Sequence, residues 1–167
     1  RRQPDCVMAA TTPDLMYQGI LARIKAAGSS SDFVDDDFIY ISPQPQFTQE
    51  DDQFVQVIPG VPQSITSEAG YFLLEEDFEV VAWSRSYLDQ GRQSTERYAN
   101  LTYGILALMS KVRSQLLNHI ISITNDGTDH MAVLPITYAR GSRLFESDEY
   151  PGWCYLSDTY QFGYEIA

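Results

Sequence analysis

The sequence predicts an α+β fold: a mainly antiparallel sheet with two amphipathic helices packed on one face, plus long loops. Two apolar stripes at helical spacing, one within residues 13–27 and one between about 94 and 119, predict the helices. Segments rich in β-branched and aromatic residues lie between and after these stripes and predict the strands. The resulting order of elements, α, β, β, α, β, β, is typical of a sheet covered on one side by helices.

The first helix is predicted over residues 13–27. Thr12 can cap its amino end, Pro13 suits the first turn, and Asp14 favours the positive end of the helix dipole. Gly28 is placed to end the helix. The predicted apolar face consists of Leu15, Met16, Ile20 and Ile24. Residues 1–12 precede this helix without periodicity and are expected to form an arm, and residues 13–167 a single domain.

A long loop is predicted over residues 29–53, with a short strand at 38–41. Prolines at positions 43 and 45 exclude a continuous central strand there. Loops of this length often carry function, and this one contains Phe33, Phe38 and Phe47. Packing in the core and contact with a partner remain equally open for these three side chains, so they are candidate interface residues.

Two strands are expected next. Residues 53–58 form a strand-like run that stops at Pro59-Gly60, a strong turn signal. After a variable stretch, residues 71–74 can extend briefly, and residues 78–83 predict a second strand that leads into Arg85.

The second helix is expected to begin at Ser94 or Thr95, after a polar connection at 88–93, and to end at about His119. Residues 125–129 have the composition of a turn. Residues 134–138 and 143–145 predict a strand interrupted by Gly141, and residues 153–166 predict either two strands or one long strand that bends at Gly163.

Composition excludes several classes of function. Eleven basic against 23 acidic side chains give a net charge of −12, which disfavours binding to nucleic acid or anionic lipid. The longest apolar run, around 105–109, is far shorter than a membrane span of about 20 residues. The two cysteines, Cys6 and Cys154, do not form a disulfide framework, which fits a reducing cytoplasm.

No catalytic, metal or cofactor site is predicted. His119 and His130 are the available imidazole bases, and a helix end and a turn account for their positions. Acidic residues gather at 35–37 and 50–52, but adjacent carboxylates point in different directions and no calcium-binding register is present. Phosphate-binding glycine loops and zinc-ligand spacings are also absent from the sequence.

The order of these elements resembles the tail terminator family of long-tailed bacteriophages, also called tail completion or minor tail proteins. The resemblance rests on the helix with residues 14–21, the strand closed by Ile58-Pro59-Gly60, and the segment 78–85 followed by Asp89, Arg92 and the long helix at 101–117. Residues 143–145 and 153–166 resemble the closing strands. The resemblance spans about residues 13–166, whereas residues 1–12 and the acidic, aromatic loop depart from it.

The resemblance implies a structural virion protein without enzymatic activity. Such a protein forms a hexameric ring on the tail tube, stops tube polymerisation and joins the tail to the head connector, first in the host cytoplasm and then in the virion. Its partners would be copies of itself, the tail-tube protein and the head-completion protein, and DNA would pass through an acidic lumen without specific binding. Arg85, Asp89 and Arg92 join the three phenylalanines as candidate interface residues.

Three alternatives to a terminator remain open at this point. A head-completion stopper or a tail-tube subunit would also be a structural protein, and a tube subunit would stack into long tubes by itself. A small monomeric domain with a pocket between helices and sheet would instead bind a small ligand.

Overall fold

The computed structural model describes residues 11–29, 34–47, 52–68, 71–85 and 104–166. The helical elements are α1 (Pro13–Lys25), the short 3-10 helices η1 (Ala26–Ser29) and η2 (Asp36–Phe38), and α3 (Ile105–Leu116). The strands are β1 (Ile39–Ile41), β2 (Gln53–Glu68), β3 (Tyr71–Arg85), β4 (Ser122–Asn125), β5 (Thr128–Met131), β6 (Leu134–Gly141), β7 (Phe145–Glu146) and β8 (Trp153–Ile166).

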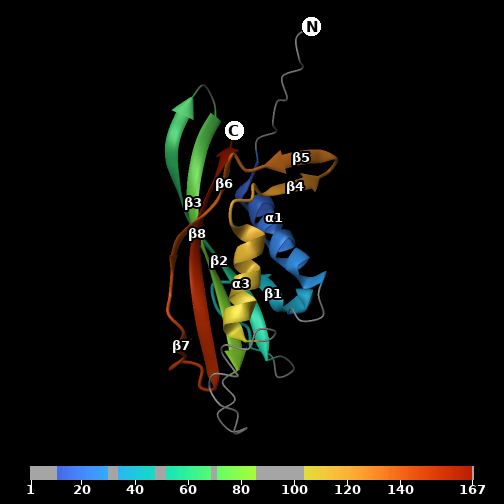
Figure 1. Ribbon diagram of the computed structural model, residues 1–167. Coiled ribbons are helices and arrows are strands. Elements are labelled where there is room, and N and C mark those ends of the chain that lie inside the picture. Colours follow the sequence, from blue (N-terminus) through green and yellow to red (C-terminus); the bar gives the residue numbers. More distant parts are fainter. Residues whose placement is uncertain (1–10, 30–33, 48–51, 69–70, 86–103, 167) are drawn as a thin grey trace.

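One twisted sheet organises the molecule, in the order β1-β2-β3-β8-β6, with β7 also paired to β8 (Figure 1). All pairs in this sheet are antiparallel except β1 with β2. Helices α1 and α3 lie side by side on one face of the sheet, and the separate β4-β5 hairpin packs beside α1. The predicted fold class is therefore confirmed.

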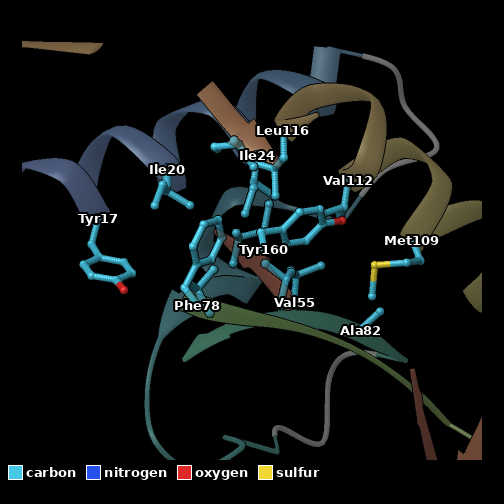
Figure 2. Packing of buried hydrophobic residues seen from close by; sticks show 14 of the residues in the cluster. Tyr17, Ile20, Ile24, Val55, Phe78, Ala82, Met109, Val112, Leu116 and Tyr160 are labelled. Atoms are coloured by element: carbon cyan, nitrogen blue, oxygen red, sulfur yellow. The ribbon is translucent and has the colours of Figure 1, made fainter. Parts of the chain in front are cut away.

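Strand alternation divides the sheet into two faces. On β3, Phe78, Val80 and Ala82 are buried toward the helices, whereas Val81 and Trp83 point to the other side. The helix-covered face holds the larger core, where side chains of α1 and α3 meet those of β2, β3 and β8 (Figure 2). Both helices bury apolar residues against this face. These residues recur every three or four positions, so a helix brings all of them to the side that faces the sheet.

Both helices end close to where the sequence predicts. Helix α1 runs over Pro13–Lys25 and passes into η1, against the predicted 13–27. Helix α3 stops at Leu116 instead of about His119, because Leu117 is extended and Asn118 has a positive φ of 61°. The Asn118 backbone N–H donates to the carbonyl of Ile136, so the chain turns into contact with β6. The predicted start of the second helix at 94 or 95 lies outside the described residues.

The predicted turn at Pro59-Gly60 is wrong. Strand β2 continues through both residues to Glu68, and its register with β3 shifts between Pro59 and Pro62. A β-bulge therefore stands where a turn was expected. A Cβ on Gly60 would lie only 1.6 Å from the Asp77 carbonyl oxygen, so the glycine allows the two strands to approach. The prolines fit because β1 pairs only as far as Val57, which leaves this part of β2 at the sheet edge.

Strand β3 is longer than the predicted 78–83, because it is continuous from Tyr71 to Arg85. Of the two alternatives for residues 153–166, one long strand is confirmed, since β8 runs unbroken through Gly163. The turn at 125–129 is confirmed, with positive φ at Asp126 and Gly127, but its flanking strands β4 and β5 were not predicted. Within the described ranges, no helix is long and apolar enough to cross a membrane.

Candidate interaction site

The sheet face opposite the helices carries a second cluster, here called the aromatic face. Its buried members are Phe54, Val81, Trp83 and Trp153, and the partly buried members packed against them are Phe38, Tyr40, Phe47, Ile58, Tyr150 and Tyr155. Strand register produces the cluster, because Phe54 pairs with Trp83 and Trp83 pairs with Tyr155 across three neighbouring strands. Among the described residues, this face is covered by short segments instead of helices.

Phe47 holds the covering segments of the aromatic face together. Its ring centroid lies 5.3 Å from that of Trp83 and 4.8 Å from that of Trp153. It also lies 4.5 Å from the ring of Tyr150, which belongs to the opposite covering segment. Phe38 packs against both the helix-side core and the aromatic face. Both candidates are therefore used inside the molecule, and their contact with a partner stays a prediction.

Arg85 lies at the end of β3 beside the aromatic face. Its guanidinium carbon is 4.9 Å from the centre of the Trp153 ring, a cation–π contact. Its Nε atom is 3.4 Å from Asp52 Oδ1, and the Arg85 side chain is 34% exposed. Arg85 is thus held in place but reachable. The other three candidates, Phe33, Asp89 and Arg92, lie outside the described residues.

The edge of β2 is a second feature that could meet a partner. Strand β1 pairs only with Val55–Val57, and of the described residues no other segment pairs with the outer edge of β2 beyond this point. Val61, Pro62, Gln63 and Ser64 are exposed here, and Val61 is 78% exposed. An edge strand of this kind offers backbone N–H and carbonyl groups to another chain.

Two buried carboxylates, Glu76 and Asp158, lie on the helix-covered face, and both accept hydrogen bonds from side chains of this chain. Asp158 is fully buried and accepts hydrogen bonds from Arg113 of α3, with Nη2 2.8 Å from Oδ1, and from the Tyr160 hydroxyl at 3.0 Å. The hydrogen bond with Asp158 raises the pKa of Arg113 further above its usual range. Burial, with the nearby Asp158 carboxylate, raises the pKa of Tyr160. These groups therefore tie α3 to β8.

A second buried carboxylate, Glu76 of β3, joins α1 to the sheet. It accepts hydrogen bonds from the hydroxyls of Tyr17 and Tyr164, the latter at 2.8 Å. Burial is the main cause that raises the pKa of both tyrosines, and the Glu76 carboxylate adds to it. The Tyr17 hydroxyl also accepts from the Gly60 N–H at 3.3 Å, which links this network to the β2 bulge.

His119 and Cys154 each make a hydrogen bond to another part of the chain, and the aspartates of η2 lie in solvent. A ring nitrogen of His119 lies 2.8 Å from Arg23 Nη2, which joins the end of α3 to α1. Cys154 is buried, and its Sγ donates to the Ser84 carbonyl at 3.3 Å. Asp36 and Asp37 are exposed in η2. Across the described ranges, no group of three or more His, Cys, Asp or Glu side chains could hold a metal ion.

Sequence reasoning missed most of the aromatic face. The sequence places Phe54, Trp83, Trp153 and Tyr155 in predicted strands without marking them as a site, although their spacing contains a usable signal. Trp153 and Tyr155 are two residues apart on one strand and must share a face, and the pattern of apolar residues on β3 assigns Trp83 to the side opposite Phe78. Only the pairing of strands distant in sequence brings these aromatic residues together.

This chain has a fold similar to that of chains in two assembled particles. No protein-family model and no curated protein sequence matches this chain. A chain from the virion of a native gene transfer agent particle matches with a TM-score of 0.52 and 10% identity, covering 91% of this chain and 92% of that chain. The sheath/tube terminator of an extracellular contractile injection system, PVC, in its extended state, matches with a TM-score of 0.54 and 13% identity. That match covers 95% of this chain and 57% of the terminator chain. At these identities the similarity shows a shared fold.

Proposed function

We propose that this chain is a structural subunit of a phage-type tail, and specifically a tail terminator. It would form a hexameric ring on the last ring of tail-tube subunits, stop tube polymerisation and present the opposite side of the ring to the head connector. The observation that carries the proposal is the fold shared with a sheath/tube terminator over 95% of this chain. The similar fold in a virion chain of nearly the same length supports the same class of role.

A ring needs two different surfaces that meet between neighbouring copies, because each copy contacts the next in a head-to-tail manner. The exposed edge of β2 around Val61 supplies one such surface, since it can extend the sheet into another subunit. The aromatic face with Arg85 supplies an amphipathic surface of a different kind, and aromatic and arginine side chains are enriched at interface cores. The proposed role requires no catalytic group.

The charge of the chain fits a passage for DNA. A net charge of −12 on each copy would surround the lumen of a ring with negative potential. Phosphate groups would then be repelled from the wall, and DNA could slide through without binding.

The test is native mass measurement together with negative-stain imaging, on the protein alone and after addition of tail tubes that lack a cap. Hexameric rings, or density confined to one end of the tube, are expected. Long homopolymers would replace the proposal with a tube subunit. A monomer that does not bind to tail tubes would overturn the structural role and favour a ligand-binding domain.

A pair of variants tests whether the β2 edge forms the ring contact. Val61→Lys places a charge on the exposed edge and is expected to abolish ring formation while the monomer stays folded. Leu106→Lys is the matched control, because Leu106 is also an exposed apolar residue but lies on α3. Loss of rings in both variants, or in neither, would remove the β2 edge from the interface.

A further inference from the structure

A groove crosses the aromatic face. Its floor spans three strands and consists of Gln56, Ile58, Glu79, Val81, Trp83 and Tyr155. One wall is the segment 43–45, which contains two prolines, and the other is the segment 145–150. The groove has a volume of about 640 Å³, which is enough for a few side chains of a peptide. It is open to solvent along its length.

Hydrogen bonds fix both walls of the groove. On the first wall, the Ser42 N–H donates to the Val57 carbonyl at 3.2 Å, and the Gln56 side-chain amide donates to the Ser42 carbonyl at 2.8 Å. On the second wall, the Ser147 N–H donates to the Trp153 carbonyl at 2.9 Å, and the Tyr150 N–H to the Ser147 hydroxyl at 3.0 Å. A groove with such walls is already formed before a partner arrives, which lowers the entropic cost of binding.

The groove is acidic as well as aromatic. Glu79 lies in the floor, and Glu146, Asp148 and Glu149 stand on the second wall. None of the described residues that line the groove is basic. The floor also contains the buried amide of Gln56, whose Oε1 accepts from Trp83 Nε1 at 3.1 Å and so fixes the plane of the indole ring. Four carboxylates beside flat aromatic rings favour the binding of a cation that can also stack on those rings.

Two arginines of this chain already stack on aromatic rings, one in the aromatic face and one in the lining of the groove. The guanidinium of Arg85 lies 4.9 Å from the centre of the Trp153 ring, and that of Arg143 lies 5.1 Å from the Phe145 ring. Both contacts border the groove region, since Phe145 lines the groove and Trp153 belongs to the same cluster. Guanidinium groups combine stacking on aromatic rings with hydrogen bonds to carboxylates, which ammonium groups do less well.

We propose that this acidic, aromatic groove is the docking site for an extended, arginine-bearing segment of a neighbouring protein in the assembly. The arginine stacks on the half-buried ring of Tyr155, and its guanidinium donates to carboxylates of the second wall. Glu79 lies further along the floor and adds to the negative potential of the groove. A volume of about 640 Å³ admits a few side chains, so an extended segment fits better than a helix, which is about 10 Å wide. The inference rests on the proposed structural role only in naming the partner as a subunit of the same particle.

Intrinsic fluorescence gives a direct measurement of docking. The chain has two tryptophans, Trp83 and Trp153, and both belong to the aromatic face. Trp153→Phe leaves Trp83 as the single fluorophore, in the floor of the groove, and the wild-type protein serves the same purpose if this variant does not fold. The probe is a short soluble peptide in which arginine alternates with serine. A saturable change in tryptophan emission is expected. Two control peptides replace each arginine by lysine or by glutamate. The lysine peptide should bind roughly tenfold more weakly, and the glutamate peptide should not bind.

Charge variants locate the binding. Glu146→Gln/Asp148→Asn/Glu149→Gln neutralises the second wall and is expected to weaken binding of the arginine peptide about tenfold. Asp36→Asn/Asp37→Asn/Asp126→Asn is the matched control, because it removes the same charge from exposed positions that do not line the groove. Equal weakening in both triple variants, or no saturable signal in the wild-type protein, would overturn the proposal. Tube capping is measured separately, so peptide docking and the terminator role can fail independently.

Discussion

The two faces of the sheet are built from the same strands but differ in how they are closed. On the helix-covered face, α1 and α3 seal an aliphatic and aromatic core, and every carboxylate buried there has partners, as at Glu76 and Asp158. On the aromatic face, short segments cover large rings and leave an open acidic groove. The first face therefore holds the helices to the sheet, whereas the second leaves part of its surface open, and its contact with other molecules is the proposal made above.

The two faces also carry the same pair of chemical groups in different settings. Arg113 and Asp158 are paired where the carboxylate is fully buried, whereas Arg85 and Asp52 are paired where both side chains remain partly in water. A buried carboxylate that loses its cation keeps its desolvation cost, and an exposed one is solvated at once. Substitutions of these two arginines therefore separate the faces, and the following expectations run from the largest effect to the smallest.

Arg113→Leu is expected to lower the free energy of unfolding by about 3 kcal/mol, because it leaves the carboxylate of Asp158 buried without its cation. Urea denaturation of the variant measures this loss. The double variant Arg113→Leu/Asp158→Asn removes the uncompensated charge as well and should recover part of the lost stability. A loss below about 1 kcal/mol in the single variant would mean that the two faces do not differ in this respect.

Phe47→Ala is expected to cost about 2 kcal/mol of stability, because the ring is only partly buried but touches four aromatic neighbours. Tryptophan emission should shift to longer wavelength, since water would then reach Trp83 and Trp153. Phe78→Ala, the same change in the helix-covered core, should cost more and leave tryptophan emission nearly unchanged. The reverse ranking would show that the aromatic face is the main source of stability.

Stability is expected to fall above about pH 10, where tyrosines of the unfolded chain ionise. Burial raises the pKa of Tyr17 and Tyr164 in the folded protein, so the folded state holds these protons more tightly than the unfolded state. Their contribution is complete below pH 10 and is lost as pH rises. Tyr164→Phe should reduce the slope of unfolding free energy against pH by up to about 1.4 kcal/mol per unit. Urea titrations across this range measure the slope, and an identical slope in wild type and variant would contradict the argument.

The sequence predicted the elements whose signals are local. Thr12-Pro13-Asp14 begins α1, the apolar and aromatic run at 78–83 lies within β3, and the turn at 125–129 is where it was expected. Pro59-Gly60 carries the same kind of local signal but marks a bulge instead of a turn, and the two differ only in the pairing with β3. A partner strand cannot be inferred from two residues.

The candidate site was predictable only in part for the same reason. Phe47 and Arg85 were named from a loop and a strand end, and the structure brings both to the aromatic face. Trp83 and Trp153, two of its buried members, join one cluster only when β3 pairs with β8, so no local signal connects them. The ion pair of Arg113 with the buried carboxylate of Asp158 likewise joins residues that are distant in sequence, and no motif marks it.

Arg85→Leu should have the smallest effect on folding, under about 1 kcal/mol, because its ion pair with Asp52 is solvated and leucine can still cover part of Trp153. If Arg85 contacts a neighbouring subunit, the same variant should reduce ring formation or tube capping although the monomer is as stable as the wild type. Urea denaturation and native mass measured on one preparation separate these effects. A stable monomer with unchanged capping would show that Arg85 only packs against its own chain, whereas a loss near that of Arg113→Leu would mean that the aromatic face is as closed as the helix-covered one.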